Sequence, residues 1–209
     1  IICGLPNQTK ESIKKTFMRI VEMSPDRICF NYLHYSPKFS KHQVVMHDGR
    51  NGRPSKLPDL FEKKMLFGEA LGVLLNGGYL RIGYDHFAKP NDDVARAVQK
   101  NTLHWNALGV TSGRYHDIIG LGLHSYSTLG DYYFQNFLEL RDYELAVTNG
   151  KFPIHRGHIL NRDDKIRRDV IKTLRNFFFL NYVDIEEKYD MEFKEYFKEE
   201  IVALAKFSE

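Results

Sequence analysis

The sequence contains only two cysteines, Cys3 and Cys29, among its 209 residues. Each lies in a short apolar run, and their wide spacing matches no metal-binding motif. We therefore interpret both as buried thiols and expect no set of metal ligands in this chain. This use of cysteine fits a reducing, cytoplasmic compartment.

Several signature motifs are also absent. The sequence contains neither GxGxxG nor GxxxxGK[ST], and it has no nucleophile elbow. No apolar run is long enough to span a membrane, and no segment resembles a signal peptide. The net charge of +3 is mild and includes no basic block, which argues against nucleic acid as a partner.

The first segment that is informative is residues 1–9, IICGLPNQT. An apolar run, a glycine-proline turn and Thr9 predict a buried strand, a tight turn and a helix N-cap. Helical periodicity up to Ser24 and a second apolar strand over 27–32 complete a βαβ unit with parallel strands. Ligands bind at the carboxyl edge of such strands. A buried strand needs neighbours, so we expect the chain to be the later part of a longer protein.

The rest of the chain is expected to be mostly helical after a long polar loop over 37–58, which would be a lid or a mobile segment. Helices are expected at 59–75, 92–102, 137–147, after Asn161 and from Met191 to the end. In the helix over 59–75, Leu60 and Leu66 are among the residues expected to face inward. Strands are expected at 79–84, 117–128 and 132–135. Gly120 would let a ligand or another backbone approach closely.

Two groups of polar residues are candidate sites, each with an ordinary structural alternative. Asp85 and His86 follow a predicted strand and could be an acid–base pair, metal ligands or a pair that holds a loop. Gly4 alone is a weak signal for a phosphate site.

The second group is a cluster of charges at the start of the helix after Asn161. Asp163–Arg167 and Asp164–Arg168 are i, i+4 pairs, which stabilise a helix by a few tenths of a kcal/mol each. The cluster is either a solvated helix face or a pair of arginines that hold a carboxylate.

Five segments, in this order along nearly the whole chain, resemble the oxygen-independent coproporphyrinogen III oxidases. They are IICGLPNQT, PDRICFNYLHYSP, GYDHFAKPNDD, DIIGLGLHSYSTLGDYYFQN and NRDDKIRRDVIKTL. The resemblance implies an α/β fold, namely the C-terminal part of a partial (β/α)6 radical S-adenosylmethionine (SAM) barrel followed by a mostly helical C-terminal domain. Residues 1–58 would hold the last two barrel strands and the following loop, and residues 59–209 the domain that covers the substrate.

The resemblance also implies the chemistry. In this family a [4Fe-4S] cluster on a CxxxCxxC loop reduces S-adenosyl-L-methionine to a 5′-deoxyadenosyl radical, which takes a hydrogen from a propionate side chain. Two such decarboxylations convert coproporphyrinogen III to protoporphyrinogen IX in haem biosynthesis. The cluster needs more thiolates than this chain has, so its ligands would lie upstream and the chain alone would be inactive.

The partners that the resemblance implies are coproporphyrinogen III and an electron donor such as a flavodoxin or ferredoxin. The protein would be a cytoplasmic monomer that binds neither nucleic acid nor a membrane.

The site residues implied by the resemblance fall in several segments of the chain. Those that match SAM contacts of the family are Ile2, Leu33 and Tyr126. Candidates for substrate binding are Asp85, His86, Arg167 and Arg168. The family usually has QGYTT where this chain has Ala107-Leu108-Gly109-Val110-Thr111, and no catalytic residue is identified.

Two other functions stay open from the sequence. Haem chaperones related to the oxidases share the barrel but usually lack the segment NRDDKIRRDVIKTL. A non-catalytic interaction domain is the other alternative, and a CxxxCxxC motif upstream of Ile1 would argue against it.

Overall fold

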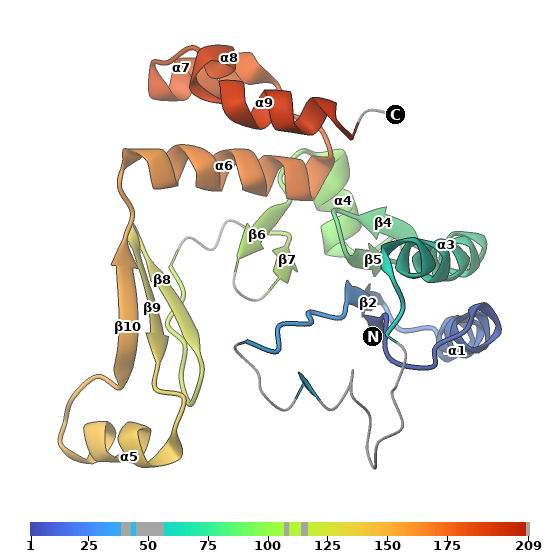
Figure 1. Cartoon of the computed structure of the whole chain (residues 1–209), viewed down its shortest axis with the longest axis horizontal. Helices are drawn as coiled ribbons and strands as arrows, with labels where there is room; N and C mark the ends of the chain where they lie inside the picture. The colour runs from blue at the N-terminus through green and yellow to red at the C-terminus, as the bar shows by residue number, and fades with distance from the viewer. Residues whose placement is uncertain (39–42, 45–56, 107–108, 114–116, 208–209) are drawn as a thin grey trace. The chain divides into compact units, whose positions relative to one another are not determined.

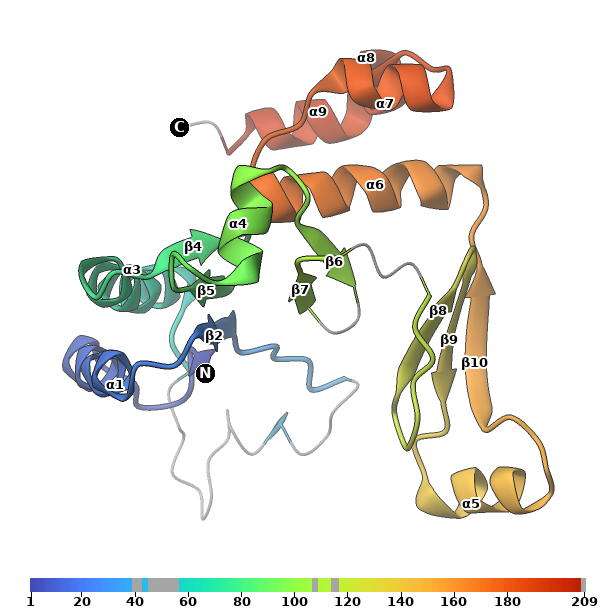
Figure 2. The same cartoon turned by 180° about the vertical axis from the view of Figure 1, so that it is seen from behind.

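The computed structural model describes residues 1–38, 43–44, 57–106, 109–113 and 117–207 of the chain. It has an α/β fold with two compact units, Ile1–Thr102 and Leu103–Glu209 (Figures 1 and 2). This division differs from the boundary expected between 58 and 59, because the helix that begins at Leu60 packs within the first unit. The loop expected over 37–58 lies almost entirely outside the described residues.

A parallel strand pair opens the first unit. Strand β1 (Ile2–Cys3) pairs with β3 (Asn31–Tyr32), with Ile2 opposite Asn31 and Cys3 opposite Tyr32. Helix α1 (Lys10–Met23) connects them, with Thr9 as its N-cap and Ser24 in the left-handed conformation at its end. The predicted βαβ unit is therefore confirmed.

The strand expected over 27–32 is split at Phe30. Strand β2 (Arg27–Cys29) pairs with β5 (His86–Ala88), which also pairs with β4 (Leu80–Ile82), and both pairings are antiparallel. At Phe30 the backbone changes partner, and its N–H donates to the carbonyl of Asp85 over 2.8 Å. Residues 86–88 are therefore the central strand of a sheet, and this strand was not predicted.

Stacked phenylalanine rings form the core of the first unit. The ring of Phe30 lies 4.6 Å from that of Phe17 and 4.9 Å from that of Phe67, centroid to centroid. Phe67 belongs to helix α3 (Leu60–Asn76), which packs against α1. Leu60 is 70% exposed, so its predicted inward position was wrong. It lies six residues before the buried Leu66, which places it on another face of the helix.

Two ends of helices in the first unit fix neighbouring segments. A Cβ atom added at Gly77, the C-cap of α3, would lie 2.8 Å from the methyl groups of Val21 on α1. Glycine at this position therefore lets the two helices approach.

Helix α4 (Asp93–Gln99) begins after Asp92, whose carboxylate accepts two 2.9 Å hydrogen bonds from Nε of Arg27 on β2.

A three-stranded antiparallel sheet forms one part of the second unit, in the order β10-β9-β8. The strands are β8 (Tyr126–Leu129), β9 (Tyr132–Asn136) and β10 (Ile154–Ile159), and helix α5 (Leu140–Thr148) connects β9 to β10. Before this sheet, β6 (His104–Asn106) pairs with β7 (Gly109–Thr111). The strand expected at 132–135 is confirmed, whereas β6, β7 and β10 were not predicted.

Gly120 lies where two backbones come close. A Cβ atom there would lie only 2.5 Å from the carbonyl oxygen of Tyr126. The predicted close approach of another backbone at Gly120 is therefore confirmed.

Helix α6 (Arg162–Phe177) and three shorter helices complete the second unit. The shorter helices are α7 (Tyr182–Tyr189), α8 (Phe193–Tyr196) and α9 (Lys198–Ala205). Their apolar faces meet around Ile166 and Val170 of α6. Within the described ranges, no helix is long and apolar enough to cross a membrane.

Asp169 on α6 holds α7 in place. Its carboxylate accepts a 2.6 Å hydrogen bond from the hydroxyl of Tyr189 and another of 2.6 Å from Nζ of Lys188. Burial alone would raise the pKa of Asp169. The hydrogen bonds from Lys188, Tyr189 and Arg168 outweigh this effect and keep the pKa below its ordinary value.

Replacing this carboxylate should weaken the second unit in a pH-dependent way. We expect Asp169→Asn to lower the free energy of unfolding by about 2 kcal/mol at pH 7, because charged hydrogen bonds contribute roughly 1.5–3 kcal/mol each. The advantage of the wild type should be complete above the unfolded-state pKa of about 3.9. It should be lost as the pH falls through the lower pKa of the folded state.

Urea unfolding between pH 7 and pH values below the ordinary carboxyl pKa measures this difference. Asp142→Asn, at an exposed position on α5, is the matched control and should change stability little. Equal stability losses for the wild type and Asp169→Asn on acidification would contradict the role of Asp169.

Gly120 provides a second test. Gly120→Ala should destabilise the second unit because the added methyl group meets a backbone carbonyl that has no rotamer by which to move away. Gly72→Ala is the control: Gly72 is exposed in the interior of α3, and no atom lies within 4 Å of the added Cβ. We expect it to stabilise the first unit by roughly 0.5–1 kcal/mol. Thermal unfolding that ranks the two variants the other way would refute this assignment.

Candidate functional site

The β1–β3 pair carries two predicted SAM residues: Ile2 is the first residue of β1, and Leu33 directly follows β3. The N–H of Leu33 donates to the carbonyl of Cys3 over 2.7 Å, one residue beyond Ile2. Ile2 is 44% exposed and Leu33 is partly exposed. The pair therefore offers an apolar surface on which a flat ring can pack.

The turn after β1 is closed by the side chain of Gln8. Its Oε1 accepts hydrogen bonds from the N–H groups of Gly4, at 2.7 Å, and Leu5, at 3.0 Å. Its Nε2 donates to the carbonyl of Ile2 over 3.0 Å. These two amides already have an acceptor, so the geometry gives no support to the weak phosphate signal at Gly4.

Asp85 lies in the turn between β4 and β5, and His86 is the first residue of β5. The carboxylate of Asp85 is buried, and its Oδ1 lies 2.6 Å from Nδ1 of His86. The backbone carbonyl of Asp85 holds Phe30, at the point where β2 ends and β3 begins. The pair is thus placed to fix the strands that lead to Leu33.

The two cysteines do not fit a [4Fe-4S] cluster, which Cys ligands hold as thiolates, commonly four. Cys3 is fully buried, and burial raises the pKa of its thiol to about 11. Its Sγ contacts the carbonyl of Lys63 at 3.6 Å. Cys29 accepts a 3.2 Å hydrogen bond from the side-chain amide of Asn31. Each thiol therefore contacts a polar group of the protein, as expected for a structural cysteine.

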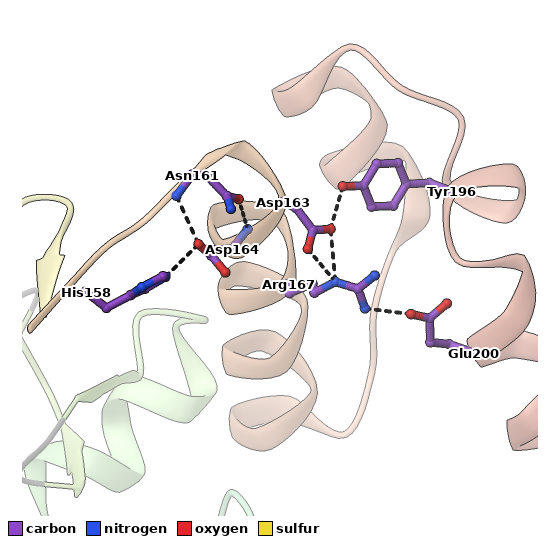
Figure 3. Close-up of polar contacts among 7 residues, drawn as sticks. All are labelled: His158, Asn161, Asp163, Asp164, Arg167, Tyr196 and Glu200. Carbon is purple, nitrogen blue, oxygen red and sulfur yellow. Dashed lines mark hydrogen bonds and ion pairs between the residues drawn. The ribbon is translucent and has the colours of Figure 1, made fainter.

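In the second unit, Arg167 joins α6 to the C-terminal helices (Figure 3). Its Nε donates to both carboxylate oxygens of Asp163 at 2.9 Å, and its Nη1 donates to Glu200 of α9 at 2.6 Å. The hydroxyl of Tyr196 on α8 also donates to Asp163, over 2.6 Å. The predicted Asp163–Arg167 pair is therefore confirmed.

The carboxylate of Asp164 interacts with Asn161 and His158 and not with an arginine of α6. It accepts hydrogen bonds from the N–H of Asn161 at 3.0 Å and from Nε2 of His158 at 2.9 Å (Figure 3). These bonds, led by the one from His158, lower the pKa of Asp164. Arg168 instead pairs with Asp169, Nε to Oδ1 at 3.1 Å. The predicted Asp164–Arg168 pair was wrong, because a carboxylate at the third helical position closes a capping box.

Tyr126 lies in the second unit and lines a cavity of about 520 Å³, which we call the second-unit cavity. Residues from β6, the three-stranded sheet and α6 surround it; among them are Trp105, Tyr133, Phe134, Arg156 and Lys172. Its size is within the range of small-molecule sites, roughly 300–1,000 Å³. Aromatic faces combined with cations can hold an organic anion that has a flat apolar body.

Sequence reasoning did not single out Arg156 or Lys172. Lys172 lies four residues after Arg168 on α6, so helical periodicity was the one available signal for it. Arg156 lies in β10, whose six residues are all exposed and show no apolar alternation. No local sequence pattern therefore indicated that this segment is a strand or which residues lie beside Arg156.

Known proteins match this chain over nearly its whole length. The oxygen-independent coproporphyrinogen III oxidase of Escherichia coli strain K12 is 39% identical over 206 residues, which cover 98% of this chain and 44% of that protein. The enzyme of the same name from Helicobacter pylori strain 26695 is 37% identical over 210 residues, again with 44% of that protein covered. No protein-family model matches the chain.

A solved structure agrees with these matches. The coproporphyrinogen III oxidase HemN from Escherichia coli, described as a radical SAM enzyme, superimposes with a TM-score of 0.84 at 38% identity. The alignment covers 99% of this chain and 46% of that one. The chain thus spans less than half the length of the relatives it matches. Over nearly its whole length, it is homologous to a part of the oxygen-independent coproporphyrinogen III oxidases.

Proposed function

We propose that this chain is part of an enzyme that converts coproporphyrinogen III to protoporphyrinogen IX without oxygen, in haem biosynthesis. The observation that supports this most strongly is the agreement of fold and sequence with HemN over 99% of the chain. The reaction is the oxidative decarboxylation of two propionate side chains, and the same proposal includes a cytoplasmic monomer and a flavodoxin- or ferredoxin-type electron donor.

The barrel assignment is also a proposal. In it, β1 and β3 are the last two strands of a partial (β/α)6 barrel. Residues 59–209 then form the domain that covers the substrate, although α3 packs closely with α1. The parallel pairing of β1 and β3, with α1 as the crossover, supports this reading.

In the proposed enzyme, Ile2 and Leu33 bind SAM by apolar contact. Ile2 is exposed on β1, and Leu33 lies at the carboxyl end of β3, where ligands of parallel strands bind. When bound to its cluster, SAM supplies the radical that abstracts hydrogen from the substrate. Tyr126 is the third SAM residue of the proposal, with its phenol ring at the second-unit cavity. The two thiols of this chain do not fit as ligands of the [4Fe-4S] cluster.

The remaining candidates receive positioning roles. Asp85 and His86 fix the strand switch at Phe30 and thereby the edge that carries Leu33. Arg167 and Arg168 hold α6 to its own carboxylates and to α9. Because these carboxylates already engage both guanidinium groups, we assign Arg167 to the contact between α6 and α9, Arg168 to a contact within α6, and neither to the substrate.

The reaction is tested with the full-length protein reconstituted with its cluster under anaerobic conditions. We expect coproporphyrinogen III, SAM and a reductant to give protoporphyrinogen IX and carbon dioxide, detected by mass spectrometry of the oxidised porphyrins. Omission of SAM should abolish the product. A protein that binds haem tightly and forms no vinyl product would instead support the chaperone alternative.

The role of Ile2 is tested by a substitution that replaces its apolar side chain with a polar amide. Ile2→Asn should raise the KM for SAM about ten-fold, because loss of an apolar contact costs roughly 1.5 kcal/mol. Met18→Asn on α1 is the matched control: Met18 is 51% exposed and lies away from the strand edge, so its KM should not change. An unchanged KM in Ile2→Asn would remove Ile2 from the proposed site.

A further inference from the structure

The second-unit cavity has cations in its wall and no carboxylate among the described residues that line it. Lys172 of α6 and Arg156 of β10 both belong to this wall. His158 also lines it, but this side chain already has a carboxylate partner in Asp164. Lys172 and Arg156 are therefore the two lining cations that have no carboxylate partner among the described residues.

Arg156 is oriented by a neutral group. Its Nε donates to Oε1 of Gln135 over 2.9 Å, and Gln135 is buried. Nε2 of Gln135 donates in turn to the carbonyl of His124 over 3.2 Å. The guanidinium is thus held in place by a neutral amide, and no carboxylate among the described residues pairs with it.

Lys172 is partly buried and forms no ion pair within the part of the chain that the structure describes. The nearby carboxylate of Asp169 already accepts hydrogen bonds from Arg168, Lys188 and Tyr189. Burial, followed by the charge of Arg168, lowers the pKa of the Lys172 ammonium. An anion in the cavity would relieve this unfavourable environment.

The other walls of the cavity are aromatic. Trp105 comes from β6 and Tyr133 from β9. Tyr126 of β8, which is assigned to SAM above, lies at the same cavity and is not counted in this wall. Such rings bind a flat apolar body by stacking or edge contacts. Gly157 adds no side chain on the β10 side, where a Cβ would already lie 3.2 Å from the carbonyl oxygen of Tyr133.

We propose that the second-unit cavity binds one propionate arm of the tetrapyrrole, with Lys172 and Arg156 paired to its carboxylate and the aromatic wall against the pyrrole ring that carries it. This inference rests on the proposed function, since it names the part of the substrate that this cavity holds. The cavity of about 520 Å³ is assigned to one arm and its ring, and the rest of the macrocycle extends beyond it.

The test is equilibrium binding of coproporphyrin III, the oxidised and unreactive form of the substrate, to the full-length holoenzyme by porphyrin fluorescence. We expect Lys172→Gln and Arg156→Gln each to weaken binding about ten-fold, as loss of a charge-assisted hydrogen bond predicts. The tetramethyl ester of coproporphyrin III has no carboxylate. The wild type should therefore bind the ester more weakly than the acid, and the variants should bind the ester with the same affinity as the wild type does.

Two controls separate charge at the site from general effects. Lys165→Gln removes the same charge from the same helix, but Lys165 pairs with Asp131 and does not line the cavity, so binding should not change. Lys172→Arg keeps the charge and should retain binding within about three-fold. If Lys172→Gln fails to fold, the inference is still tested by the affinity of Arg156→Gln and Lys172→Arg for coproporphyrin III and by the affinity of the wild type for the ester.

Two results would overturn the inference: affinity for coproporphyrin III unchanged in both neutral variants, or equal wild-type affinity for the acid and the ester. The outcomes also separate this inference from the proposed function. A wild type that decarboxylates coproporphyrinogen III while the variants bind normally would refute the cavity assignment alone. Charge-dependent binding without decarboxylation would refute the proposed function and leave the carboxylate site standing.

Discussion

The carboxylates of α6 hold the second unit together, because each accepts hydrogen bonds from a different element. Asp164 joins the helix to β10 through His158, and Asp163 joins it to α8 through Tyr196. Asp169 joins it to α7 through Tyr189. These bonds fix the rotation of α6 about its axis, and with it the face that carries Lys172 into the wall of the second-unit cavity. The helix therefore links the packing of the unit to its binding chemistry.

In the first unit, the change of strand partner at Phe30 has a comparable role. The phenylalanine ring lies in the core, stacked on Phe67, while its backbone passes from an antiparallel to a parallel neighbour. The core contact fixes the point at which the change occurs. The parallel pair that follows is only two residues long, so its register depends on this anchor and on the bond from Leu33 to Cys3.

The starts of α1, α3 and α6 could be predicted from the sequence because the groups that set them are local. The N-caps Thr9, Asp59 and Asn161 each bond to a residue three positions later. Helix α7 was not predicted, and the single helix expected from Met191 onward is divided into α8 and α9. The pairing of β1 with β3 was also predictable, since a short βαβ crossover leaves few alternatives.

Other features depend on contacts between distant segments. Strand β5 pairs with β2 across nearly 60 positions, and no periodicity within 86–88 indicates it. Strand β10 has no buried residue, so no alternation identified it as a strand. At the candidate sites, Ile2 is 44% exposed, whereas the apolar run at the start of the chain was predicted to be a buried strand. The second-unit cavity is built from β6, the three-stranded sheet and α6, and it could be found only in three dimensions.

Two glycines described above place different limits on how this sequence can vary among related proteins. The space at Gly77 is restricted by the side chain of Val21, so a larger residue at 77 becomes possible once residue 21 is smaller. These two positions should therefore covary. At Gly120 the obstacle is a carbonyl oxygen of the main chain, which no exchange of a neighbouring side chain removes. That position should stay glycine in every lineage that keeps this backbone path.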